Sequence, residues 1–211
     1  MRTLIIGASK GTGALAVAAA LARGHEVTAF ARSPQNLSLD DARLRRLPGD
    51  FHDRTSVSAA VPGHDAVIVT ASAGSIRAFK AQPNYFSQGT GYVIDAMKAS
   101  GVKRLVVLSA LGVAESRKQM GFLLDKLMIS WLLKVPYADH ERQEALVKAS
   151  ALDWVIARPS RLTNGPARGR YKKETGDARV PASIARADVA HFLVEAASVD
   201  TWLKKAVQLG G

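Results

Sequence analysis

The feature that most constrains the fold is a glycine-rich turn near the start of the chain. Residues 3–6 form a short apolar run, the motif G-x-x-x-G-x-G follows it directly, and an alanine-rich helical segment comes next. Gly7 allows a tight turn off the strand, Gly11 lets a ligand approach the backbone, and Gly13 lets the helix pack closely. Because a helix N-terminus offers unpaired N–H groups, this order of strand, turn and helix predicts a phosphate-binding unit typical of dinucleotide sites.

Short apolar runs and helix-like segments alternate along the rest of the chain. Strands are predicted at residues 3–6, 25–31, 44–47, 65–70, 103–109, 152–157 and 206–209, and helices at 14–23, 56–61, 85–100, 121–134, 138–150 and 186–198. This alternation predicts a parallel sheet covered by helices on both faces. A chain of 211 residues fits one domain. We therefore expect the α/β class, as a single Rossmann-like domain over residues 1–211 with a doubly wound, mostly parallel sheet.

The end of the second predicted strand bears on which dinucleotide is bound. An NAD-binding unit normally places Asp or Glu there to bond the ribose 2′-hydroxyl. Here the strand ends in Arg32, and Asp40 and Asp41 come too late. A planar guanidinium suits a 2′-phosphate, and Lys10 and Ser33 are placed to join it. The sequence thus predicts NADP(H) in preference to NAD(H).

Residues 164–182 are rich in Gly, Pro, Arg and Lys and lack a clear period. A loop of this length within a compact domain is commonly functional. Because it follows the last core strand of the predicted sheet, we expect a lid over the cofactor cleft.

Charge and composition limit the kinds of partner that we expect for this chain. The net charge is +11, yet the basic residues are scattered and no aromatic platform interleaves with them, so nucleic acid is not expected. The longest apolar stretch, residues 121–135, contains Asp125 and Lys126 and is shorter than the ~20 residues of a membrane span. With no cysteine, no secretory signal pattern and no metal-ligand spacing among five histidines, we expect a cytoplasmic monomer or small homo-oligomer without metal or membrane.

Further segments carry a family resemblance. They are Gly49-Asp50, residues 65–69, Gly89-Thr90 leading into 94–98, residues 101–104, residues 108–110 and Arg158-Pro159-Ser160. With the glycine turn, they resemble the atypical short-chain dehydrogenase/reductases, and most of all the NAD(P)H-binding group that includes biliverdin reductase B (flavin reductase) and NmrA-like proteins. The resemblance covers most of the chain and is weakest over residues 115–137 and 164–182.

The resemblance implies a cofactor site at the C-terminal ends of the strands. Residues 50 and 51 would flank the adenine, 70–72 the adenosine ribose and pyrophosphate, 109 and 110 the nicotinamide, and 159–161 its carboxamide. The expected cofactor-binding set is Gly7, Ser9, Lys10, Gly11, Thr12, Gly13, Arg32, Asp50, Phe51, Thr70, Ala71, Ser72, Ser109, Ala110, Pro159, Ser160 and Arg161. A turn-forming role for Asp50 and a strand-end cap at Ser109 remain open as structural alternatives.

The usual acid–base pair of the main short-chain branch, Tyr-x-x-x-Lys, is missing. None of the chain's four tyrosines has a lysine four residues on. Tyr137 lies nearest the expected place but is followed by Glu141, whose charge is wrong for lowering a tyrosine pKa. Ser109 and Tyr137 are the candidate catalytic residues. His140 and Glu141 are expected on a solvated helix face, with a position facing the cleft as the alternative. Asp188 is expected at the start of the late helix.

Three functions remain open on this basis. Hydride transfer to a flavin, a quinone or a similar conjugated molecule needs positioning more than a tyrosine acid, and its proton can come from solvent. An NADPH-dependent reductase of that kind is therefore the first hypothesis. The alternative is a non-enzymatic NAD(P)(H)-sensing regulator of the NmrA-like type. A sugar-nucleotide epimerase comes third, because it would need the missing pair and a larger C-terminal domain.

Overall fold

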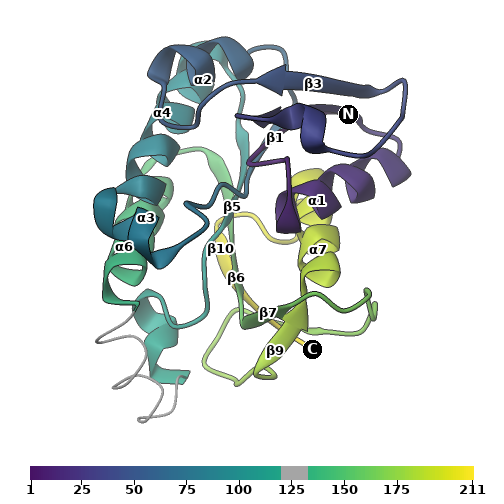
Figure 1. Cartoon of the computed structure of the whole chain (residues 1–211). Helices are drawn as coiled ribbons and strands as arrows, with labels where there is room; N and C mark the ends of the chain where they lie inside the picture. Colours follow the sequence, from purple (N-terminus) through teal and green to yellow (C-terminus); the bar gives the residue numbers. More distant parts are fainter. Residues whose placement is uncertain (120–132) are drawn as a thin grey trace.

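The structure, a computed structural model, describes residues 1–119 and 133–211 (Figure 1). In this part of the chain, eight strands form the main sheet in the order β3-β2-β1-β4-β5-β6-β10-β8. Their bounds are β1 Arg2–Ile6, β2 Glu26–Ala31, β3 Leu44–Pro48, β4 Ala66–Val69, β5 Arg104–Leu108, β6 Asp153–Pro159, β8 Lys172–Glu174 and β10 Lys205–Gly210. All neighbouring pairs are parallel except β10 and β8. The predicted α/β class and mostly parallel sheet are confirmed.

Helices cover both faces of the sheet. On one face lie α1 (Gly11–Ala22) and α7 (Arg186–Ser198), and on the other lie α2 (Arg54–Ala60), α4 (Tyr85–Ser100) and α6 (Lys134–Ala149) (Figure 1). The strands supply both cores because successive side chains point to opposite faces. In β1, Ile5 packs with α1 and α7, while Leu4 and Ile6 pack with the opposite layer. None of the helices in the described residues combines the length and hydropathy needed to cross a bilayer.

Most predicted elements are found within a few residues of their predicted ends. The helices at residues 85–100 and 186–198 coincide with α4 and α7. The helix predicted at 138–150 starts earlier, at Lys134. Its first turn includes Pro136, and proline is tolerated there because N–H groups of the first turn have no intrahelical partner. The helix predicted at 121–134 falls almost wholly outside the described residues. The short helix α3 (Ile76–Ala81), which packs against α6, and two 3₁₀ turns, η1 (Pro34–Asn36) and η2 (Ala114–Gln119), were not predicted.

Residues 164–182 contain more structure than the sequence predicted. Strand β8 lies inside this segment and pairs antiparallel with β10, so the expectation of a segment without regular structure is wrong there. Just outside it, β7 (Arg161–Thr163) pairs with β9 (Ser183–Ala185) in a small parallel sheet. Local sequence gives little signal for β8, because its pairing partner lies more than thirty residues away.

Two side-chain contacts fasten this segment to α7. Asp188, in the first turn of α7 as predicted, accepts hydrogen bonds from the backbone N–H groups of Arg168 and Gly169. Lys173 Nζ lies 2.7 and 2.8 Å from the two carboxylate oxygens of Glu195 and also stands over the ring of Trp202. The role of the segment as a lid stays a prediction.

Two glycines of α4 give a matched test of its packing. A Cβ at Gly89 would lie 2.3 Å from the ring of Phe51, whereas a Cβ at Gly91 would meet nothing within 4 Å. We expect Gly89→Ala to lower the free energy of unfolding by about 1–3 kcal/mol through overpacking. Gly91→Ala should raise it by about 0.5–1 kcal/mol, because alanine removes the helix penalty of glycine. Urea denaturation measures both, and equal shifts for the two variants would contradict the packing seen around Phe51.

Candidate functional site

The three glycines of the N-terminal turn have different surroundings. A Cβ on Gly7 would lie 2.6 Å from the backbone of Ala71, and one on Gly13 would lie 2.2 Å from the carbonyl oxygen of Gly7. These two glycines therefore allow the turn to close against the end of β4. Gly11 has φ +58° and open space where its Cβ would stand. The middle glycine thus faces a volume that a ligand can enter.

The N-terminus of α1 is open to an anion. Lys10 is the N-cap residue, but no side chain caps the helix, and the first turn holds no acidic residue. The first backbone N–H groups of a helix lack intrahelical partners and carry a partial positive charge. The uncapped helix end and the open space at Gly11 together fit a pyrophosphate, which accepts hydrogen bonds from such groups.

A cleft of about 650 Å³ lies beside this turn, at the C-terminal ends of β1 to β4. Its walls are Ile6, Gly7, Ser9, Lys10, Phe30, Ala31, Arg32, Ser33, Asn36, Gly49, Asp50, Phe51, Thr70, Ala71, Ser72 and Tyr85. Nine residues of the predicted cofactor-binding set are among them, and Gly11, Thr12 and Gly13 follow at the start of α1. The structure therefore brings together the predicted adenosine and pyrophosphate end of the site. Whether these residues bind a cofactor stays a prediction.

Polar groups around the cleft have distinct roles. Arg32 is exposed at the end of β2, and no described residue bonds its guanidinium. Asp50 Oδ1 accepts from the backbone N–H of His52 at 2.9 Å, so the turn-forming alternative for Asp50 is also realised. The Thr70 hydroxyl donates to the carbonyl oxygen of Ile6 at 2.9 Å and so supports the glycine turn. Arg32 and Lys10, neither of which has a partner among the described residues, are the cations of this wall that are available to a ligand.

Tyr85 is a wall of the cleft that sequence reasoning missed. It begins α4, and burial raises the pKa of its hydroxyl. Gly89, not lysine, lies four residues after Tyr85, so the tyrosine–lysine pattern gives no signal at this position. Its place beside Asp50 and Phe51 depends on how α4 packs, which local pattern does not reveal.

The predicted nicotinamide end lies apart from this cleft. Ser109 and Ala110 follow β5, Pro159 ends β6, and Ser160 and Arg161 come next. None of these residues is among those that line the cleft. Ser109 is 5% exposed, and its hydroxyl donates to Glu144 Oε1 at 2.7 Å. The hydroxyl of Ser160 is buried and has no partner among the described residues.

A buried ion pair holds this end together. The side chains of Glu144 and Arg158 are each 1% exposed, and the guanidinium donates to both carboxylate oxygens at 2.9 and 2.5 Å. A third donation, at 2.8 Å, reaches Glu115 Oε1. Burial opposes the charge of Arg158, but the two carboxylates outweigh it and raise the pKa of its guanidinium. The hydrogen bond from Arg158 lowers the pKa of Glu115 to about 2. Sequence reasoning assigned no role to Glu144 or Glu115.

The N-terminal half of α6 carries the other candidates. Tyr137 donates from its hydroxyl to the carbonyl oxygen of Leu111 at 3.1 Å, and burial raises its pKa. A catalytic tyrosine needs the opposite shift. The expectation that His140 lies on a solvated face is wrong, because it is 8% exposed and stacks on Phe86 with ring centroids 3.8 Å apart. Glu141 is exposed, as expected.

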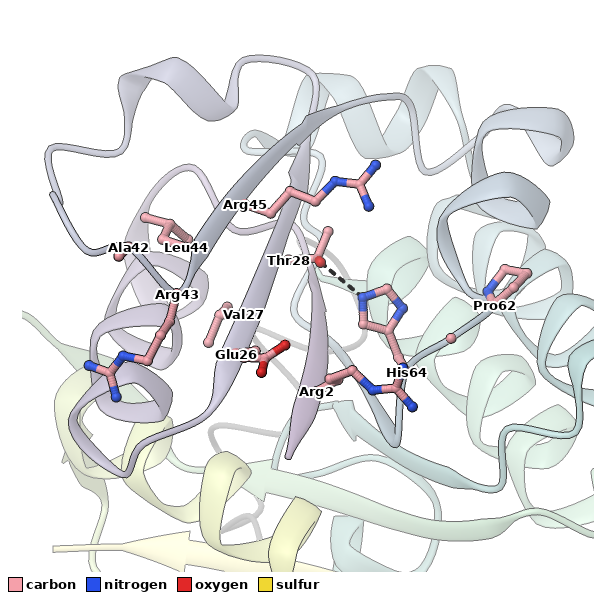
Figure 2. A pocket seen from close by; sticks show the side chains of 11 residues that line it. Arg2, Glu26, Val27, Thr28, Ala42, Arg43, Leu44, Arg45, Pro62 and His64 are labelled. Carbon is pink, nitrogen blue, oxygen red and sulfur yellow. Dashed lines mark hydrogen bonds between the residues drawn. The ribbon is translucent and has the colours of Figure 1, made fainter.

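A second hollow, of about 540 Å³, lies at the opposite, N-terminal edge of the sheet. Figure 2 shows Thr28 and His64 at its centre, joined by a hydrogen bond of 2.9 Å, with Arg45 of β3 beside them. Open parallel sheets bind ligands at their C-terminal edge. The cleft beside the glycine turn is therefore the candidate site, and this hollow offers a control position.

Fold and cleft together define a dinucleotide-binding protein of the Rossmann class, and comparison with known proteins gives the family. The family model described as NAD(P)H-binding matches residues 7–200, so the chain belongs to that family. This confirms the resemblance seen in the sequence.

Sterol demethylase protein B of Methylococcus capsulatus is 32% identical over 176 residues, which cover 79% of this chain and 52% of that protein. This chain thus spans about half the length of that relative. An uncharacterized sugar epimerase, YhfK of Bacillus subtilis, is 29% identical over 183 residues, covering 83% and 77%.

Solved structures share the fold. The oxidoreductase ylbE from Lactococcus lactis has a TM-score of 0.83 at 20% identity, with 100% of this chain and 91% of that chain covered. A short-chain dehydrogenase/reductase from Veillonella parvula in complex with NADP has a TM-score of 0.82 at 18% identity, covering 100% and 94%. ChuY, an anaerobillin reductase from Escherichia coli O157:H7, has a TM-score of 0.79 at 24% identity, covering 100% and 97%.

The Glu115–Arg158 contact predicts a pH effect on stability. The folded pKa of Glu115, about 2, lies below its ordinary value of 4.5. Its contribution to the free energy of unfolding is therefore complete above pH 4.5 and is lost as the pH falls toward 2. We expect Glu115→Gln to flatten the pH dependence of stability in that window. Urea denaturation at several pH values measures this, with Glu141→Gln, an exposed carboxylate of α6, as the control. An unchanged slope in Glu115→Gln would contradict the contact.

Proposed function

We propose that this chain is an NADPH-dependent reductase that transfers hydride to a flavin, a quinone or a similar conjugated small molecule. The observation that carries the cofactor choice is Arg32, an exposed guanidinium at the end of β2 and in the wall of the cleft. A carboxylate at that point would favour NADH, and an arginine favours a 2′-phosphate.

Different residues of the cleft would bind different parts of the cofactor. The open turn around Gly11 and the start of α1 would hold the pyrophosphate through backbone N–H groups. Arg32 and Lys10 would bind the 2′-phosphate, and Asp50 and Tyr85 would border the adenine. Bound in this direction, the dinucleotide would extend toward the ends of β5 and β6, where Ser109 lies. When bound, the reduced nicotinamide would supply a hydride there.

The choice of a conjugated acceptor rests on the missing tyrosine–lysine pair. Reduction of a ketone needs a proton at the oxygen as the hydride arrives, and Tyr137 has a raised pKa and no lysine four residues on. An extended π-system spreads the arriving charge and needs less help from a positioned acid. Similarity in fold to ChuY, an anaerobillin reductase, and to a short-chain dehydrogenase/reductase in complex with NADP supports this proposal. The same missing tyrosine–lysine pair disfavours the epimerase activity named for YhfK.

Cofactor preference is tested at Arg32. We expect Arg32→Ala to raise the dissociation constant of NADPH by about 10- to 100-fold, because a charge-assisted contact to phosphate contributes roughly 1.5–3 kcal/mol. The affinity for NADH should stay within about twofold. Isothermal titration calorimetry measures both. Arg45→Ala is the control, because it removes the same charge from the far edge of the sheet (Figure 2). Equal affinity of the wild type for NADPH and NADH would contradict the proposal.

Turnover is tested separately from binding. NADPH oxidation, followed by absorbance, should exceed background when riboflavin 5′-phosphate or a benzoquinone is added to the wild-type protein. The variant Arg32→Ala should need more NADPH to reach the same rate. Tight NADPH binding without any oxidation across such acceptors would favour the sensing regulator over the reductase.

A further inference from the structure

Helix α6 is fixed to its neighbours by buried polar contacts along one face. Near its start, Asp139 accepts from the backbone N–H of Phe86 and from the Ser87 hydroxyl, each at 2.5 Å, and so caps α4. One turn later, Glu144 bonds to Ser109 of the β5 end and to Arg158 of β6. These contacts set both the depth and the rotation of α6 against the sheet.

His140 lies on the same face as Glu144, four residues earlier. Residues four apart on a helix are stacked one above the other, about 6 Å apart along the axis. Because only a short turn joins the end of α6 to the start of β6, α6 runs antiparallel to the strands. Its earlier residues therefore lie farther toward the C-terminal side of the sheet. Since Glu144 contacts residues at the ends of β5 and β6, His140 lies past that edge, on the side where the reacting end of the site is proposed.

Hydrogen bonds define which nitrogen of His140 carries the proton. The side-chain amide of Gln143 donates to the Thr90 hydroxyl at 2.8 Å, so its oxygen faces His140 Nδ1 at 2.9 Å. Nδ1 must then donate. In the neutral ring, Nε2 keeps its lone pair. No described residue bonds Nε2, which leaves this nitrogen for a ligand or water.

We propose that His140 is the proton-transfer residue of this reductase, with Gln143 as the residue that positions it. The inference rests on the proposed function. The acceptor gains a hydride, with its two electrons, from the cofactor and a proton from Nε2 of the His140 imidazolium. The neutral ring then takes a proton from solvent. The acceptor needs a nitrogen or oxygen that becomes basic as the hydride arrives, as a flavin or a quinone has.

The charges around His140 set the expected pH dependence. Burial lowers the pKa of His140, while Asp139 and Glu144 on its own helix act in the opposite direction. From α4 it meets the uncharged Phe86, and Arg158 of β6 is paired with carboxylates. Helix α3, which also packs on α6, holds its two charged residues, 77 and 80, at exposed positions. The imidazolium therefore becomes scarce before the pH reaches the ordinary histidine pKa of 6.5, and the rate of reduction should fall as the pH rises through the lowered pKa.

Nuclear magnetic resonance tests the geometry without turnover. In protein labelled with ¹⁵N-histidine, His140 should be neutral at pH 7 with its proton on Nδ1, and saturation with NADPH should shift its Nε2 resonance. The spectrum of His140→Gln identifies the signal among the five histidines. A neutral ring with its proton on Nε2 instead of Nδ1, or an unchanged resonance with NADPH bound, would overturn the proposal even if no acceptor is found.

Kinetics test the chemistry. With riboflavin 5′-phosphate or a benzoquinone as acceptor, His140→Gln should lower kcat by at least about 100-fold, the usual size of a general acid's contribution. The KM for the acceptor and the dissociation constant for NADPH should stay within about twofold, and the pH dependence should flatten. His191→Gln, an exposed histidine of α7, is the matched control.

Gln143→Leu keeps the imidazole but removes the acceptor of the Nδ1 proton. It should lower kcat less than His140→Gln does, and it provides a second variant if the first does not fold. Unchanged kcat and pH profile in a folded His140→Gln protein would overturn the role of His140 while leaving the reductase intact. A wild-type protein that binds NADPH but reduces no acceptor would instead count against the proposed function.

Discussion

The buried ion pair between Glu144 and Arg158 fixes where α6 lies relative to the sheet. Two donations from the guanidinium and one from Ser109 meet at a single carboxylate. Removing both charges from water costs several kcal/mol per ion, and even a bidentate geometry offsets this only in part. The pair is therefore weak evidence of net stability. Its main effect is positional, because it joins β5, β6 and α6 at one point near the C-terminal ends of the strands.

That position connects the two halves of the site. Through Asp139, α6 also holds the first turn of α4, where Phe86 and Ser87 donate to its carboxylate. The residue before them, Tyr85, lines the cleft beside the glycine turn. One helix thus contacts the first turn of α4, next to the wall of the cleft beside the glycine turn, and also the ends of β5 and β6. A change in the packing of α6 should alter both halves together.

The sequence predicted those parts of the site that depend on local order. The glycine turn and Arg32 follow directly from a strand, a turn and a helix, and all lie where the pattern placed them. Tyr85 and Glu144 gave no such signal, because their neighbours are far away in the chain. His140 was expected on a solvated face of its helix. The structure buries it instead, and it bonds to Gln143, another buried polar residue of the same helix.

Electrostatics distinguish the two hollows at the edges of the sheet. Both contain arginines. At the N-terminal edge Arg43 is paired with Asp41 and Arg2 with Asp65, while Arg45 has no partner among the described residues. The C-terminal ends of α1 and α2, with their partial negative charge, also point to that edge. At the C-terminal edge, α1 presents its uncapped N-terminus, and Arg32 has no partner among the described residues. A helix dipole and an unpaired guanidinium then act in the same direction, so a polyanion is attracted to the cleft beside the glycine turn rather than to the hollow opposite.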